Sequence, residues 1–199
     1  IAIIKESFSS QEAINLLSIA NNDRPNYPPI VKKFSSLLIN NNEFTKAKKL
    51  ILKCWAHFPH QMLFDEYVNI SRSENTNIIN NVSKLIKNNP NEYDSIIAMA
   101  KAHILEKNWE RAKNLMKPLL SSKPSKTVCE VMHDIELGMS GNAQKANSWK
   151  NRILMGDYEK TWVCKYTGYI QDNWSPVSEG GFLNSLEWTW PKTDKIKEK

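Results

Sequence analysis

The sequence has few cysteines and glycines and no long hydrophobic run. Its three cysteines, Cys54, Cys129 and Cys164, are odd in number and far apart, so we expect free thiols in a reducing compartment and no disulfide framework. No stretch of about 18 apolar residues could cross a bilayer, and no signal-peptide pattern is present. The 27 basic and 21 acidic residues give a net charge of +6, but the dispersed lysines form no stripe typical of nucleic-acid binding.

Signatures of catalysis and metal binding are also missing. The sequence contains no Gly-rich phosphate loop, Ser-His-Asp order or specific carboxylate pair. Cys54, His57 and His60 could be written as a Cys-x2-His-x2-His cluster, but Cys54 falls at a core-facing position and His60 lies beyond a helix-ending proline. His103 and His133 fall at helix-packing positions, where histidine is usually structural. We therefore expect no enzyme, no metal site and no cofactor.

Small residues and prolines recur with a period of 34 residues. Ala13 and Ala47 are 34 residues apart, as are Ala112 and Ala146. Prolines at positions 25, 59 and 124 each follow one of these alanines by twelve residues. A small residue lets the two helices of a hairpin approach closely, and the proline ends the second helix. This period and these two positions resemble the tetratricopeptide repeat, TPR.

Each repeat unit contains two runs of helical periodicity. Residues 30–39 and 45–55 form one such pair around an Asn-Asn-Asn turn, and 127–154 forms the last pair around Gly141. The middle unit, 59–90, is three residues short and has Ile78 in place of the alanine. The prediction for residues 1–155 is therefore all-α, a TPR-type superhelix of antiparallel helix hairpins.

The composition changes after residue 155. Four of the six glycines and four of the seven tryptophans lie between Gly156 and Trp190. Short segments at 163–164, 169–170 and 186–188 favour strands, so we expect 156–191 to form a small three-stranded β-ribbon packed on the last helices. Its predicted core is tryptophan: Trp162, Trp174, Trp188 and Trp190. Residues 192–199 are expected to be a charged flexible tail.

The same segment reads as a zinc ribbon that has lost its ligands. Two C-x2-C knuckles would supply four thiolates to a tetrahedral zinc. The spacing is kept at Cys164, Thr167, Ser178 and Gly181. Three of these side chains are poor ligands or absent, so one thiolate remains and no zinc is expected. We predict that tryptophan burial replaces the metal.

Three features together resemble a known family, the HemY-like proteins. They are the degenerate TPR units, a last repeat that reads Val-Cys-Glu-Val-Met-His-Asp-Ile-Glu-Leu-Gly-Met-Ser-Gly-Asn-Ala, and a tail with Trp-Val-Cys, Trp-Ser-Pro-Val and Phe-Leu-Asn-Ser-Leu-Glu-Trp. The resemblance implies the cytoplasmic-facing part of a bacterial inner-membrane protein linked to heme and porphyrin biosynthesis. Its membrane anchor would precede Ile1. Many members carry all four knuckle cysteines, of which Cys164 alone is matched here.

Two other interpretations stay open. The chain also resembles lipopolysaccharide-assembly regulators that join TPR repeats to a metal-knuckle module, and a heme-handling protein would need a pocket with an axial His or Cys. We favour a non-enzymatic scaffold whose partners are proteins, including membrane-associated heme-pathway enzymes. Stacked repeats bind such partners in a concave groove, and the repeat phase puts six positions in its wall: Lys32, Ser36, Asn40, Ile97, Lys101 and Leu105. The aromatic tail is the alternative binding surface.

Overall fold

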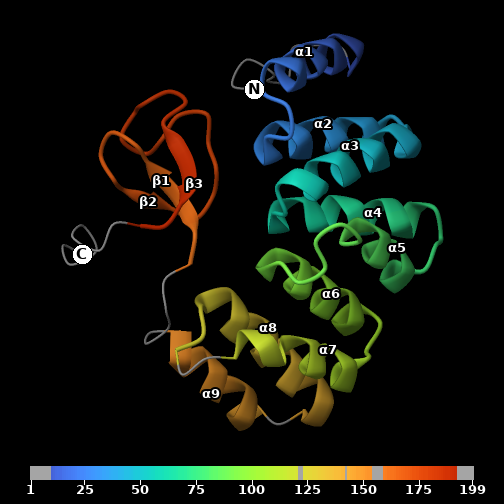
Figure 1. Ribbon diagram of the computed structural model, residues 1–199, viewed down its shortest axis with the longest axis vertical. Coiled ribbons are helices and arrows are strands. Elements are labelled where there is room, and N and C mark those ends of the chain that lie inside the picture. Colours follow the sequence, from blue (N-terminus) through green and yellow to red (C-terminus); the bar gives the residue numbers. More distant parts are fainter. Residues whose placement is uncertain (1–9, 121–122, 142, 154–158, 192–199) are drawn as a thin grey trace.

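The computed structural model describes residues 10–120, 123–141, 143–153 and 159–191. Within these ranges the chain is mostly helical and ends in a small β-sheet (Figure 1). The elements are α1 (Ser10–Asp23), α2 (Pro28–Asn40), α3 (Phe44–His57), a 3-10 helix η1 (Gln61–Leu63), α4 (Phe64–Ser73), α5 (Ile78–Leu85), α6 (Tyr93–Leu105), α7 (Trp109–Met116), a 3-10 helix η2 (Lys117–Leu119), α8 (Lys126–Ser140), α9 (Ala143–Ile153), β1 (Thr161–Cys164), β2 (Ile170–Gln171) and β3 (Leu186–Thr189).

The helices form hairpins that stack along the long axis of the molecule (Figure 1). Helix α2 packs on α3, α4 on α5, α6 on α7 and α8 on α9, while α2 also packs on α4 and α6 on α8. The predicted helices at 30–39 and 45–55 are confirmed as α2 and α3, and the last pair as α8 and α9.

Three of the hairpins close with the same turn. Each has one residue with positive φ after its first helix: Asn42 (61°), Asn75 (51°) and Lys107 (58°). In each case the next backbone N–H donates to a carbonyl five residues earlier, with N···O distances of 2.8 to 2.9 Å. This is the Schellman geometry that satisfies the last carbonyls of a helix. The fourth hairpin uses Gly141 at φ 61°, so one local solution recurs from unit to unit.

Helix α6 joins the two halves of the helical core. Ala98 and Ala102 belong to the cluster built by α2 to α5, whereas Ile97 and Ala100 pack with residues of α7 and α8. All four side chains are fully buried. Small side chains on both faces let neighbouring helices approach α6 closely, so α6 contributes to both hydrophobic clusters of the stack.

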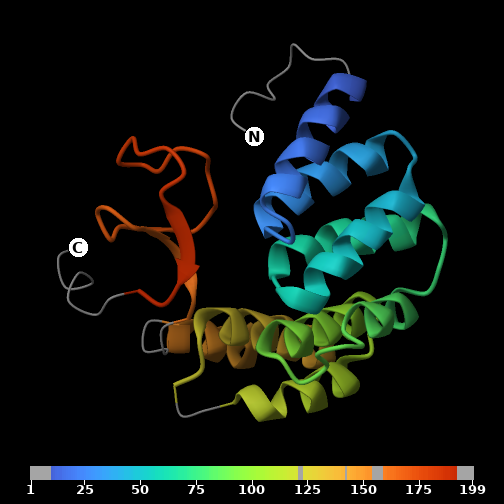
Figure 2. The same cartoon turned by 45° about the horizontal axis from the view of Figure 1, so that its top comes forward.

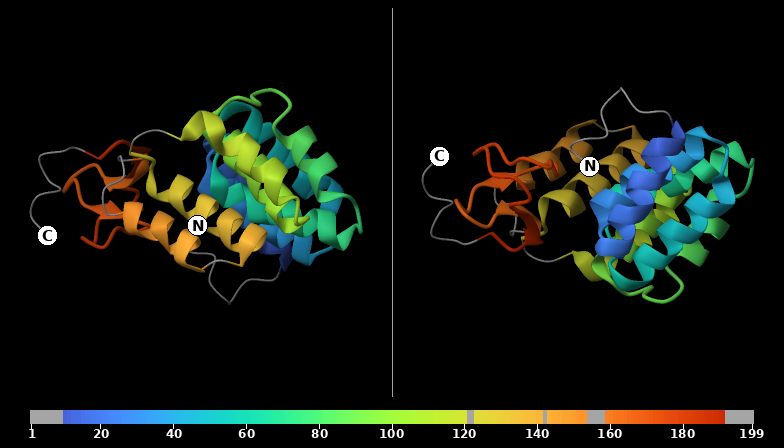
Figure 3. Two further views of the ribbon diagram at one scale, coloured as in Figure 1. Left: turned by 90° about the horizontal axis from the view of Figure 1, so that it is seen from below. Right: turned by 90° about the horizontal axis from the view of Figure 1, so that it is seen from above.

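The three predicted strands are confirmed with small shifts in their bounds. The sheet order is β2-β1-β3, and both pairs are antiparallel. The ribbon lies to one side of the helical stack in each view (Figures 2 and 3). The predicted boundary at 155/156 falls within residues 154–158, and the predicted tail at 192–199 also lies outside the described residues.

Candidate functional site

The ribbon packs against the first half of the helical stack. Its buried residues Trp162, Cys164 and Leu186 form a cluster with Tyr27, which precedes α2, and with Met62 of η1. The expected docking on the last helices is therefore wrong. No described residue of α8 or α9 belongs to this cluster, and Ala146 is the one buried side chain among those described in α9. The loops around Tyr27 and Met62 offer apolar area instead.

The predicted tryptophan core is correct in part. Trp162 is 2% exposed, and Trp174 and Trp188 are partly buried against it. Trp190 is 58% exposed, so its assignment to the core was wrong. Trp190 directly follows the last residue of β3 and lines the cavity described next.

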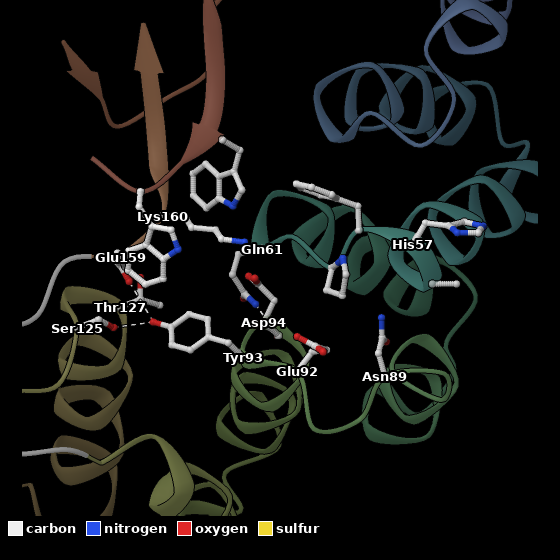
Figure 4. A pocket seen from close by; sticks show the side chains of 15 residues that line it. His57, Gln61, Asn89, Glu92, Tyr93, Asp94, Ser125, Thr127, Glu159 and Lys160 are labelled. Atoms are coloured by element: carbon white, nitrogen blue, oxygen red, sulfur yellow. Dashed lines mark hydrogen bonds between the residues drawn. The ribbon is translucent and has the colours of Figure 1, made fainter. Parts of the chain in front are cut away.

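A cavity of about 700 Å³ lies where the ribbon meets the helices (Figure 4). Its walls come from the end of α3, η1, the starts of α6 and α8, and both ends of the ribbon. Phe58, Tyr93, Trp188 and Trp190 supply aromatic surface. The polar lining consists of His57, Gln61, Asn89, Glu92, Asp94, Ser125, Thr127, Glu159 and Lys160. Its volume is in the range of ligand and peptide-side-chain sites in proteins.

One side of the cavity is a fixed hydrogen-bond network. The Tyr93 hydroxyl donates to Glu159 Oε2 at 3.0 Å and lies 2.6 Å from Ser125 Oγ. Thr127 Oγ1 donates to Glu159 Oε1 at 3.0 Å (Figure 4). Burial raises the pKa of Tyr93, and the Glu159 carboxylate raises it further. The phenol therefore stays protonated and holds the carboxylate in place.

Asp94 points into the middle of the cavity (Figure 4). Burial raises the pKa of its carboxyl group to about 6, although hydrogen bonds from Gln61 and the charge of Lys101 act in the opposite direction. Gln61 Nε2 also donates to the Asp94 carbonyl at 2.6 Å. The carboxylate is thus ionised at neutral pH at a cost in free energy that a bound cation would offset.

Among the four positions that keep the zinc-knuckle spacing, Cys164 supplies the one thiol. Burial would raise the pKa of Cys164, but hydrogen bonds from the Ser185 and Thr167 hydroxyls and from two backbone N–H groups lower it to about 6. Ser178 Oγ accepts from the Phe182 N–H at 3.3 Å, and Gly181 supplies a turn at φ 82°. The described residues contain no group of three His, Cys, Asp or Glu side chains arranged to hold a metal. The hydroxyl groups that contact the thiol belong to Thr167 and Ser185.

The predicted groove positions are distributed over several environments. Lys32 and Asn40 are exposed, and the Ser36 hydroxyl donates to the Lys32 carbonyl within its own helix. The ammonium group of Lys101 lies 5.9 Å from the Phe64 ring centre, and Leu105 is 41% exposed at the end of α6.

Ile97 is fully buried. Its placement in the groove wall was wrong because it packs into the core shared with α7 and α8. The charge of Lys32 acts on the His60 imidazole, and that of Lys101 acts on the Asp94 carboxyl group. The structure therefore places both lysines near the contact between helices and ribbon.

The sequence did not single out Asp94, Tyr93 or Glu159. Glu92 and Asp94 stand at the start of α6, where carboxylates are common because they interact favourably with the helix dipole. Glu159 is 65 residues further along. No local pattern connects them, and only the position of the ribbon brings them together.

No protein-family model, curated protein or solved structure matches the chain. Among the described residues, none of the helices has the length and apolar character needed to span a membrane.

Proposed function

We propose that the chain is a non-enzymatic scaffold that binds a segment of a protein partner in the cavity between its helical stack and its ribbon. The observation that carries this proposal is the cavity itself, because its aromatic walls and fixed polar groups are typical of a recognition site. Aromatic anchors of this kind dominate the binding free energy of many protein interfaces.

The stack is proposed to be a TPR-type superhelix. Ala13, Ala47, Ala112 and Ala146, which set the 34-residue period, are all buried, and the last three lie in the second helix of a hairpin. The recurring turns support the same interpretation, because equivalent units should close alike. The resemblance of the sequence to HemY-like proteins is our reason to propose that the scaffold belongs to an inner-membrane protein of heme biosynthesis, with membrane-associated pathway enzymes as its partners.

Photo-crosslinking tests this function. A photoreactive phenylalanine analogue at Glu92, on the cavity wall, is expected to capture a defined protein from a bacterial membrane extract. The matched control carries the analogue at Glu130, an exposed residue of α8 that does not line the cavity. Mass spectrometry identifies the adduct, and a heme-pathway enzyme is expected. Equal capture at both positions, or none at Glu92, contradicts the proposal.

Charge reversal tests the predicted groove separately. Lys32→Glu together with Lys101→Glu should lower adduct yield. Lys32 is exposed, so its change should leave the thermal midpoint nearly unchanged. Lys101 is half-buried beside the Phe64 ring, so its change is expected to lower the midpoint. An unchanged adduct yield would show that the partner does not contact Lys32 or Lys101.

Titration with heme tests the alternative that the chain is a heme-handling protein. A Soret shift proportional to protein concentration would support that function instead of the scaffold.

A further inference from the structure

The cavity is acidic although the chain as a whole is basic. Glu92, Asp94 and Glu159 line it together with one lysine, Lys160, whereas the whole chain carries +6. Among the described residues, no ion pair joins any of the three carboxylates to a basic side chain. The local charge of the lining therefore complements a cation.

Two indole rings stand beside these carboxylates. Trp188 belongs to β3, Trp190 directly follows that strand, and both line the cavity. Trp190 keeps 58% of its surface exposed. A tryptophan left open next to an acidic wall offers its ring face to a cation, the arrangement of cation–π recognition.

We propose that the cavity binds an arginine side chain of the partner segment, with its guanidinium group between the Trp190 indole and the carboxylates of Asp94 and Glu159. This rests on the proposed function and names the chemistry of the segment that enters. The Tyr93 and Thr127 hydroxyls hold Glu159 in position before binding. A site organised in advance loses less entropy on binding.

Arginine fits this lining better than lysine. Its guanidinium group is planar, presents five N–H donors and stacks on aromatic faces, while the ammonium of lysine is compact and more strongly hydrated. Burial raises the pKa of Asp94 to about 6, so a bound cation would stabilise its ionised form. At about 700 Å³ the cavity also has room for residues that flank the arginine.

The test uses the full chain and four short peptides. Each is an acetylated and amidated pentapeptide, Gly-Ser-X-Ser-Gly, in which X is arginine, lysine, citrulline or norleucine. Binding is followed by NMR through the indole N–H signals of the nitrogen-15-labelled protein. The arginine peptide should shift the Trp188 and Trp190 signals saturably. Citrulline keeps the shape of arginine without its charge, so its binding should be at least about tenfold weaker, the loss expected for one charge-assisted hydrogen bond. Lysine should fall between them.

Three variants assign the interaction to the cavity. Asp94→Asn and Glu159→Gln should each weaken the arginine peptide about tenfold, and Trp190→Ala should do the same by removing the exposed ring. Glu130→Gln, which removes an acid elsewhere on α8, should leave binding unchanged. If Glu159→Gln disturbs folding, the surface variant Trp190→Ala still gives the answer. Equal binding of arginine and citrulline peptides, or equal weakening by Glu130→Gln, overturns the assignment.

The two proposals fail in different ways. Photo-crosslinking at Glu92 with no saturable arginine-peptide binding overturns the arginine site and leaves the scaffold function in place. If the analogue at Glu92 captures no partner and the arginine peptide does not bind saturably, both the scaffold function and the arginine site are overturned. Competition of the photo-adduct by the arginine peptide, but not by the citrulline peptide, supports both.

Discussion

The His60 imidazole lies 4.2 Å from the Trp188 indole, centre to centre, at the contact between helices and ribbon. The imidazole also stacks with Phe58, at a centre-to-centre distance of 6.2 Å. The ring is 4% exposed, and its Nδ1 accepts a hydrogen bond from the Met62 N–H at 3.1 Å. Burial, with a contribution from the charge of Lys32, lowers the pKa of His60 to about 4. The neutral imidazole is thus part of what holds the ribbon to the stack.

Acidification should destabilise this contact. Between pH 6.5 and about 4 the unfolded chain binds a proton at His60 that the folded protein excludes, so the free energy of unfolding falls as the pH falls through this window. The expected loss is on the order of 3 kcal/mol. Urea unfolding across this pH range measures it. In a His60→Gln variant the pH dependence should be flatter by that amount, and an equally steep curve would contradict the role of His60.

Asp94 should have the opposite effect. Its pKa is raised to about 6 in the folded state, so it lowers stability as the pH rises through that value. Asp94→Asn is expected to raise the free energy of unfolding by about 1–2 kcal/mol at pH 7.5 and to have little effect at pH 4. The same variant should bind the arginine peptide about tenfold more weakly, so stability would be gained at the expense of binding. Destabilisation at pH 7.5 would count against this account.

Glu136 joins three helices at one buried carboxylate. It is 3% exposed and forms ion pairs with Lys113 of α7 at 2.6 Å and Lys145 of α9 at 2.9 Å. Burial would raise the pKa of Glu136, but the hydrogen bonds and charges of the two lysines lower it.

Removing the Glu136 carboxylate and removing its two lysine partners should lower the free energy of unfolding by different amounts. Glu136→Gln leaves two partly exposed lysines that can reach water, so we expect a loss of about 1 kcal/mol. Lys113→Met with Lys145→Met leaves a buried charge unpaired, and we expect about 3 kcal/mol. Chemical denaturation of both variants measures the difference. Equal losses of unfolding free energy in the two variants would show that the buried, unpaired carboxylate is not the main source of destabilisation.

Gly138 of α8 lies against the indole of Trp109. A Cβ atom at this glycine would come within 2.6 Å of the ring. Helix propensity alone favours Gly138→Ala by about 1 kcal/mol, but overpacking costs about 1–3 kcal/mol. We expect net destabilisation, measured by thermal unfolding. The double variant with Trp109→Leu should recover the loss, and stabilisation by the single change would disprove the close packing.

The ribbon should fold without metal. A chelator is expected to leave the thermal midpoint unchanged, and elemental analysis should find no zinc in proportion to protein. Trp188→Ala should lower stability by about 2 kcal/mol, because a half-buried ring contributes less than a fully buried one. One tightly held zinc per chain would overturn this prediction.

The sequence by itself determined the local structure. Apolar residues at helical spacing predicted the bounds of α2 and α3 to within three residues. Ala47 and Ala112, which were predicted to lie where two helices pack closely, are buried. These features depend on neighbours a few residues away, so the chain carries them in its periodicity. The three short strands were predictable for the same reason, since glycine and proline flank them.

Only the tertiary structure decided where the ribbon packs and what it encloses. Trp190 resembles Trp162 in its sequence context, yet Trp190 is exposed and Trp162 is buried. The residues that cover Trp162, Tyr27 and Met62, lie 100 or more residues away in the sequence. The wrong helical phase at Ile97 arose because α6 is apolar on nearly all sides, so the sequence pattern does not define which of its faces points to solvent. Asp94 and Glu159 line one cavity because of the same long-range packing, and no local sequence pattern predicts that they lie together.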